Sequence, residues 1–231
     1  MFSAIKRTFR ELGWLDALLY YFSEIIFRSS GGRARLVRYQ LVAQPVAVSP
    51  VISKVDPNTE IRRIFPGDPL SRNFPRAPEI IAMRFARGDV CLAATVKGRF
   101  AGFIWLAFGA YDEDEVRCRY ELRGDGVSWD YDIHVEPEFR MGRCFIRLWD
   151  AANTLLRERK IRWSISRISA FNPTSLNSHA RLGTRLLGKA SFLILGSLQL
   201  SFIGKWIPHL SLRDASSPKL TLSSPTMDKA R

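Results

Sequence analysis

Cysteine, histidine and acidic residues are scarce in this sequence. The 231 residues include three cysteines and three histidines, and 22 Asp and Glu stand against 35 Lys and Arg. The cysteines are far apart without a Cys-x-x-Cys pair, and the histidines lack zinc-ligand spacing, so we expect neither a disulfide framework nor a metal site. The expected compartment is reducing, which favours the cytoplasm.

The sequence also has no long hydrophobic run. The stretch from Gly13 to Phe27 is rich in Leu, Tyr, Phe and Ile, but it is shorter than a bilayer span and carries Asp16 and Glu24. The first residues lack the apolar core and small-residue cleavage site of a signal peptide. Neither a P-loop nor a G-x-S-x-G nucleophile elbow occurs. We therefore expect no transmembrane helix and no leader. We also expect neither the phosphate binding of a P-loop nor the serine nucleophile of a G-x-S-x-G elbow.

The overall composition is that of a globular protein with a strong positive charge. Hydrophobic residues make up 46% of the chain, the net charge is +13, and the isoelectric point is about 10.2. Such a field favours anionic partners, namely nucleic acid, a membrane surface or a phosphate-rich cofactor. Because the charge is spread along the chain without a recognised reading motif, nucleic acid is the least favoured of the three.

An amphipathic helix is expected at residues 8–29, within an N-terminal segment of residues 1–33. Its apolar residues recur every three or four positions, Lys6, Arg7 and Arg10 precede it, and two serines and two glycines end it. Two interpretations stay open. The apolar face packs on the rest of the protein, or it lies on an anionic membrane.

The remaining pattern predicts an α+β domain over residues 34–207, followed by an irregular Ser- and Pro-rich tail at 208–231. The expected fold is a mixed, mostly antiparallel sheet with helices on both faces. Alternating apolar residues and turn signals place the strands, including a hairpin that turns at Lys97-Gly98. The expected strands are 35–48, 90–96, 100–108, 116–122, 128–135, 162–169, 185–195 and 199–203, and the expected helices are 78–87, 143–159 and 174–182.

The segment from Trp129 to Gly183 carries the clearest chemical signal. A strand ending in WDYDIHV runs through EPEFRMGRCF into a helix. Such a junction directs backbone N–H groups and a helix dipole at one point, which favours an anion, and Arg140 and Arg143 flank it. The alternative is an ordinary surface turn with solvated arginines.

The order of motifs in this segment resembles the GNAT superfamily, the GCN5-related N-acetyltransferases. The resemblance covers about residues 75 to 205 and includes the hairpin VCLAATVKGRFAGFIWLAF. The motifs that carry it are, in order, Val135-Glu136-Pro137, the loop Arg140 to Phe145, Asn172-Pro173-Thr174-Ser175, His179 and Leu182-Gly183.

This resemblance implies an acyltransferase that uses acetyl-CoA or another acyl-CoA and an amine acceptor, without a metal. The backbone N–H of Val135 would polarise the thioester carbonyl, and Asn172 would hydrogen-bond pantetheine or hold splayed strands. The full set of implied cofactor-binding residues is His134, Val135, Arg140, Met141, Gly142, Arg143, Cys144, Phe145, Asn172 and Ser175.

The sequence departs from the family in two places. Arg143 and Phe145 stand where the family has glycines that let the backbone approach the pyrophosphate, and Gly142 is displaced by one position. His179 stands where the family usually has a Tyr that protonates the leaving thiolate. A histidine can serve as that acid because its ordinary pKa lies near neutrality, and the alternative is a polar residue of a helix face.

A general base is also required, because a protonated amine cannot attack. The candidates on the strand before the loop are Asp130, Tyr131, Asp132 and His134. Strict alternation puts Asp132 and His134 on one face and Tyr131 on the other, with Val135. By family analogy the face of Val135 looks toward the acceptor, which makes Tyr131 a pocket residue and leaves Asp132 behind it or in a structural role.

The sequence therefore predicts an N-acyltransferase whose catalytic candidates are Tyr131, Asp132 and His179. The alternative is a catalytically inactive GNAT-like binding or scaffolding module. Either one would be cytoplasmic, or would lie at an anionic membrane surface through residues 1–33.

Overall fold

The structure is a computed structural model that describes residues 2–204, 207–212 and 217–225. The chain forms two compact units whose segments alternate along the sequence. We call Pro45–Ala110 with Leu122–Ser164 the central unit, and Met1–Gln44 with Tyr111–Glu121 and Ile165–Arg231 the terminal unit. Each unit is described by itself.

The central unit contains an antiparallel sheet with strand order β7-β4-β3-β2. The hairpin between β3 and β4 turns at Lys97-Gly98, as the sequence predicts, and both residues have positive φ, at 50° and 74°. That pair of angles suits a two-residue turn whose twist matches the strands. The strands are β2 (Thr59–Ile64), β3 (Val90–Val96), β4 (Arg99–Ala107) and β7 (Val127–Val135).

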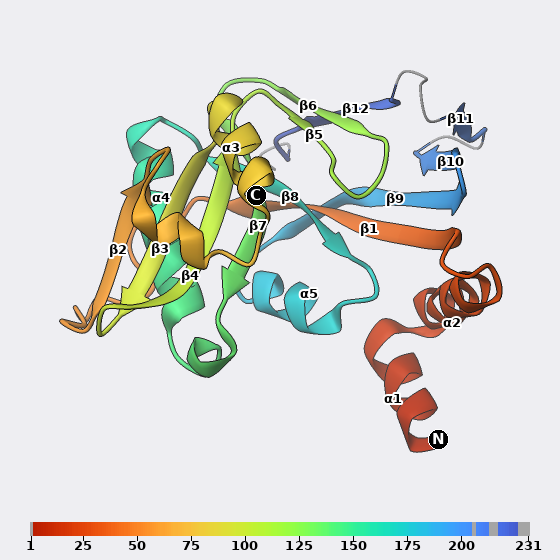
Figure 1. Ribbon diagram of the computed structural model, residues 1–231, viewed down its shortest axis with the longest axis horizontal. Coiled ribbons are helices and arrows are strands. Elements are labelled where there is room, and N and C mark those ends of the chain that lie inside the picture. Colours follow the sequence, from red (N-terminus) through yellow and green to blue (C-terminus); the bar gives the residue numbers. More distant parts are fainter. Residues whose placement is uncertain (1, 205–206, 213–216, 226–231) are drawn as a thin grey trace, which may run out of the picture. The chain divides into compact units, whose positions relative to one another are not determined.

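Helices cover both faces of this sheet (Figure 1). On one face, α3 (Pro78–Ala86) places Arg84 and Phe85 against the Trp105 ring. On the other, α4 (Cys144–Glu158) buries Leu148 and Trp149. Two single-turn helices, η1 (Pro69–Asn73) and η2 (Pro137–Phe139), precede α3 and α4. The chain is thus an α+β protein with a mostly antiparallel sheet, as the sequence predicts.

Strand β7 contains a β-bulge, so its side chains do not alternate strictly between the two faces as the sequence predicts. Tyr131 pairs with Trp105 and His134 pairs with Phe103, so three steps along β7 match two steps along β4. Asp132 takes up the extra residue with a positive φ of 48°. Because cross-strand partners share a face, Tyr131 and His134 lie on the same face, not on opposite ones.

The terminal unit contains strands in the order β11-β10-β9-β1-β8 and a separate three-stranded sheet in the order β12-β6-β5. The β9–β1, β10–β9 and β10–β11 pairs are antiparallel. Its main helix after the N-terminal region is α5 (Pro173–Ala180). The strands are β1 (Ala34–Pro45), β5 (Ala110–Asp112), β6 (Arg119–Arg123), β8 (Trp163–Ser169), β9 (Arg185–Leu195), β10 (Leu198–Ile203), β11 (His209–Ser211) and β12 (Lys219–Ser223).

Three expectations about local structure differ from what the structure shows. The N-terminal helix is two helices, α1 (Phe2–Leu12) and α2 (Trp14–Ser29), because Gly13 between them has a φ of 76° that ends the first. Strand β2 lies between the expected strand 35–48 and the expected helix 78–87, where the sequence predicts no strand. Strands β11 and β12 lie in the tail expected to be irregular, and residues 213–216 and 226–231 of that tail fall outside the described residues. None of the described helices is long and apolar enough to cross a bilayer.

Candidate functional site

The junction between β7 and α4 is held by the backbone of its neighbours. The N–H of Glu136 donates to the carbonyl of Ala101 at 2.9 Å, which extends the strand pairing one residue past β7. Arg140 turns its Nε back to the carbonyl of Val135, also at 2.9 Å, and the N–H of Gly142 donates to Phe139 at 3.1 Å. The loop that the sequence assigns to phosphate is therefore a compact turn fixed to the strand end.

A hollow of about 450 Å³ opens at the N-terminus of α4. The helix starts after Arg143 with no side-chain cap, and its first N–H groups have no partner within the helix. These groups and the helix dipole favour an anion at this end. The hollow is lined by Lys54, Val55, Asp56, Pro57, Thr59, Val96, Phe139, Gly142, Arg143, Cys144 and Arg147.

Three cationic side chains and one carboxylate line this hollow. The cations are Lys54, Arg143 and Arg147, and Arg147 also donates from Nη2 to the carbonyl of Lys54 at 3.0 Å. That bond ties the 54–59 segment to α4. The carboxylate is Asp56, whose oxygens accept from the Thr59 hydroxyl at 2.7 Å and from the Asn58 N–H at 3.0 Å. With three cations against one carboxylate, the lining has an excess of positive charge, which suits a phosphate-bearing ligand.

Only some of the predicted loop residues line the hollow. Gly142, Arg143 and Cys144 line the hollow, whereas Arg140 is engaged with Val135 and Met141 is 98% exposed. Burial raises the pKa of the Cys144 thiol to about 11, so this side chain stays neutral. Phe145 follows in the first turn of α4 and is half-buried.

The sequence reasoning missed Lys54 and Arg147. Arg147 lies one helical turn after Arg143, and this spacing alone predicts that the two share a helix face. No local signal marks Lys54, because it reaches the hollow from 93 positions before Arg147 in the sequence.

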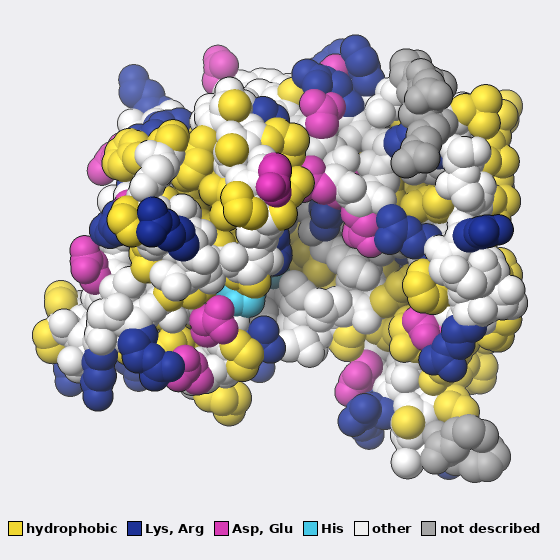
Figure 2. Space-filling view, viewed as in Figure 1, with side chains coloured by type: hydrophobic (Ala, Val, Ile, Leu, Met, Phe, Trp, Pro, Cys, Tyr) yellow, Lys and Arg dark blue, Asp and Glu magenta, His cyan; other side chains and the backbone are white. Residues whose placement is uncertain are grey.

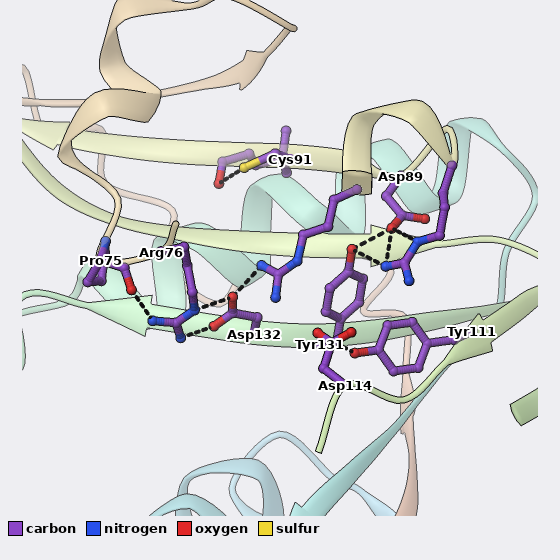
Figure 3. A network of polar contacts seen from close by, with 11 residues as sticks. Pro75, Arg76, Asp89, Cys91, Tyr111, Asp114, Tyr131 and Asp132 are labelled. Atoms are coloured by element: carbon purple, nitrogen blue, oxygen red, sulfur yellow. Dashed lines mark hydrogen bonds and ion pairs between the residues drawn. The ribbon is translucent and has the colours of Figure 1, made fainter. Parts of the chain in front are cut away.

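The bulge in β7 presents Asp132 to two arginines of the central unit (Figure 3). Arg76 donates from Nε to Oδ2 at 2.8 Å and from Nη2 to Oδ1, and Arg84 donates from Nη1 to Oδ2. The guanidinium of Arg84 also lies over the rings of Trp105 and Tyr131, at 5.4 and 5.0 Å. Both oxygens of Asp132 are therefore engaged in ion pairs with arginines.

Two polar residues, Asp89 and Arg87, hold the side chain of Tyr131. Its hydroxyl donates to Oδ2 of Asp89 at 2.5 Å, and Arg87 donates to the same oxygen at 2.8 Å (Figure 3). Burial, and then the hydrogen bond to Asp89, raise the pKa of the phenol, so Tyr131 is protonated at neutral pH. In this state Tyr131 is a proton donor and not a base.

His134 lies on the same face, stacked against Phe103 with ring centroids 5.6 Å apart. Its Nε2 lies 3.2 Å from Oε1 of Glu136. Val135 ends the strand opposite Gly102, whose missing side chain allows the two backbones to approach. A Cβ there would lie 2.4 Å from the carbonyl oxygen of His134.

The other three predicted residues belong to the terminal unit. Asn172 caps α5, and its Oδ1 accepts from the N–H of Ser175 at 3.0 Å. His179 lies on the same helix and is buried, with 6% of its surface exposed. Burial lowers its pKa to about 4. The near-neutral pKa that favours His179 as an acid in the sequence is therefore absent in the folded protein.

Comparison with known proteins finds similarity only among solved structures. No family model matches the chain, and no curated protein matches it. A functionally unknown conserved protein from Staphylococcus epidermidis is similar at 13% identity and a TM-score of 0.49, over 74% of this chain and 65% of that one. The match therefore spans less than two thirds of that protein.

Several other similar structures are GNAT acetyltransferases. A tandem GNAT protein from the clavulanic acid biosynthesis pathway is 15% identical, with a TM-score of 0.47, over 74% of this chain and 57% of that one. An aminoglycoside acetyltransferase from an uncultured soil metagenomic sample is 12% identical, with a TM-score of 0.41, over 56% of this chain and 90% of that one. These likenesses concern the fold.

Proposed function

We propose that this protein is an acyl-CoA-dependent N-acyltransferase of the GNAT type, which transfers an acyl group, in the first instance acetyl, to an amine. The single observation that carries the proposal is the hollow at the N-terminus of α4. Lys54, Arg143 and Arg147 line it beside the uncapped helix end. The order of motifs from Val135 to Gly183 supports the same function.

The chemistry of this hollow suits the phosphates of coenzyme A. The N–H groups of the first turn of α4 can donate hydrogen bonds to phosphate oxygens. Arginine adds paired donors that match phosphate geometry, and the lysine adds a point charge. Arg143 replaces a family glycine, so its side chain provides charge at a position where the family relies on the backbone.

In the reaction, the amine nitrogen attacks the thioester carbonyl, a C–N bond forms and the C–S bond breaks. The proton that the nitrogen loses balances the one that the thiolate of coenzyme A takes up. The backbone N–H of Val135 would stabilise the oxyanion. Tyr131 would be a residue of the acceptor pocket, because its phenol stays protonated and its hydroxyl donates to Asp89. Asp132 would position the face of β7 through its arginines.

Calorimetric titration with acetyl-CoA and desulfo-CoA tests the proposal directly. We expect micromolar binding by the wild type and a loss of at least tenfold in Arg143→Ala/Arg147→Ala, since each phosphate contact by a charged group is worth about 1.5–3 kcal/mol. The matched control is Arg123→Ala, which removes an exposed arginine of the same unit that does not line the hollow. Absence of binding to either ligand by folded protein at low salt would overturn the proposal.

The second candidate function is a GNAT-like module that binds without turnover. The engagement of both Asp132 oxygens by Arg76 and Arg84 favours it, because this carboxylate is then held in ion pairs. Release of the coenzyme A thiol in the presence of a panel of amines separates the two functions. Binding of acetyl-CoA without amine-dependent release indicates the inactive module.

A further inference from the structure

Helix α2 carries an apolar stripe that faces away from its own unit. Trp14, Leu18, Phe22 and Ile25 recur every three or four residues, and their exposed fractions are 77%, 55%, 47% and 65%. Residues at this spacing lie on one side of a helix. Isolated exposed apolar residues are common on proteins, but a continuous stripe of large ones marks an interaction surface.

The opposite side of α2 fixes the helix in this orientation. Asp16 is buried and forms ion pairs with Arg38 at 2.7 Å and with Lys189 at 3.1 Å. Two turns further, the hydroxyl of Ser23 donates to the carbonyl of Leu36 at 2.9 Å. The side of α2 that faces strands β1 and β9 thus contains the polar groups Asp16 and Ser23 beside the small Ala17, while the large apolar side chains of the stripe remain exposed.

Helix α1 adds positive charge next to the stripe. Lys6, Arg7 and Arg10 are exposed on α1. The ring of Phe9 packs edge-on against Trp14 with centroids 4.9 Å apart, which joins the two helices. Figure 2 shows hydrophobic side chains beside Lys and Arg side chains over these helices.

We propose that the stripe on α2, together with the basic side of α1, docks this protein on an anionic lipid surface. Aromatic and branched apolar side chains enter the boundary between headgroups and acyl chains, while arginine and lysine stay at the phosphates. Charge decides between the two occupants that an apolar face could take. A second copy of this chain would bring two basic helices together, whereas an anionic leaflet complements them.

Vesicle co-sedimentation of the full chain tests this docking. We expect binding to vesicles of phosphatidylglycerol and phosphatidylcholine at least about tenfold stronger than to phosphatidylcholine alone, and weaker at high salt, because the leaflet attracts each nearby cation. Leu18→Glu/Phe22→Glu should lower the binding at least about tenfold by opposing insertion and adding negative charge. The matched control, Val48→Glu/Val51→Glu, changes two exposed apolar residues outside the helices, at 89% and 59% exposure, and should bind like the wild type.

Three further measurements keep the result unambiguous. Circular dichroism of the two glutamate variants shows whether each is folded, and sedimentation velocity without vesicles reports self-association. Brominated lipids should quench the tryptophan fluorescence less in Trp14→Phe than in the wild type, since Trp14 is the exposed tryptophan of the stripe.

The docking is independent of the proposed acyl transfer, because an inactive protein would bind vesicles equally well. Equal binding to anionic vesicles by the wild type and a folded Leu18→Glu/Phe22→Glu variant would overturn it. A dimer that the same variant dissociates, without vesicle binding by the wild type, would also overturn it and would assign the stripe to a second copy.

Discussion

His179 should couple the stability of this protein to pH between about 6.5 and 4. The imidazole is buried on α5, and burial lowers its pKa to about 4 in the folded state. In the unfolded chain its pKa returns to about 6.5. As the pH falls below the unfolded value, the unfolded state binds a proton that the folded state refuses, so stability falls with pH across this window.

The size of the effect follows from the two pKa values. A difference of about 2.5 units, at about 1.36 kcal/mol per unit, gives a loss of about 3 kcal/mol by the time the pH reaches the folded-state value. That loss is a large part of the free energy of unfolding of an ordinary domain, which is about 5–15 kcal/mol. The variant His179→Gln keeps a neutral polar side chain and has no proton to bind, so it should not show this component.

Urea denaturation at pH 7.5 and at pH 4 measures the difference for the wild type and His179→Gln. The wild type should lose about 3 kcal/mol more than the variant over this interval. Carboxylates titrate in both proteins, and the comparison removes their common contribution. Because the chain has three histidines, ring NMR signals can be assigned by single substitutions. A His179 signal that titrates near pH 6.5, or equal losses in the two proteins, would refute the reasoning.

Two other predictions concern the face of β7. Asp132→Asn should destabilise the protein by about 3 kcal/mol in urea denaturation, because it leaves the buried Arg84 charge facing a neutral amide. The double variant Asp132→Asn/Arg84→Met should recover part of this loss. An unchanged unfolding midpoint in Asp132→Asn would contradict the ion pair. Gly102→Ala should lower the free energy of unfolding by about 1–3 kcal/mol, because its Cβ would lie 2.4 Å from the His134 carbonyl oxygen. Gly188→Ala places a Cβ in open space and should change the unfolding midpoint far less. Equal midpoints for the two alanine variants would show that the backbones do not approach as described.

Local structure in this protein could largely be predicted from neighbouring residues. The Lys97-Gly98 turn, the strand 128–135 and the helix after Arg143 follow from positive-φ chemistry and from side-chain periodicity, which act over a few positions. For the same reason the sequence indicates a mostly antiparallel sheet with helices on both faces. It misses the break at Gly13, because an amphipathic pattern continues across it.

The candidate site depends on contacts that no local pattern contains. The hollow at α4 needs Lys54, which Arg147 contacts across 93 positions. The bulge at Asp132 moves Tyr131 and His134 to one face, and its cause lies in the pairing of β7 with β4. Neither feature could be read from alternation within a single strand.

The sequence by itself determined which helix is amphipathic, how charged the chain is and which residues flank the strand–helix junction. Only the tertiary structure decided which way α2 faces, that His179 is buried, and that both oxygens of Asp132 are occupied. The physical reason is the range of the interactions. Backbone propensity and periodicity act between near neighbours, whereas burial and ion pairing depend on segments that meet only when the chain folds.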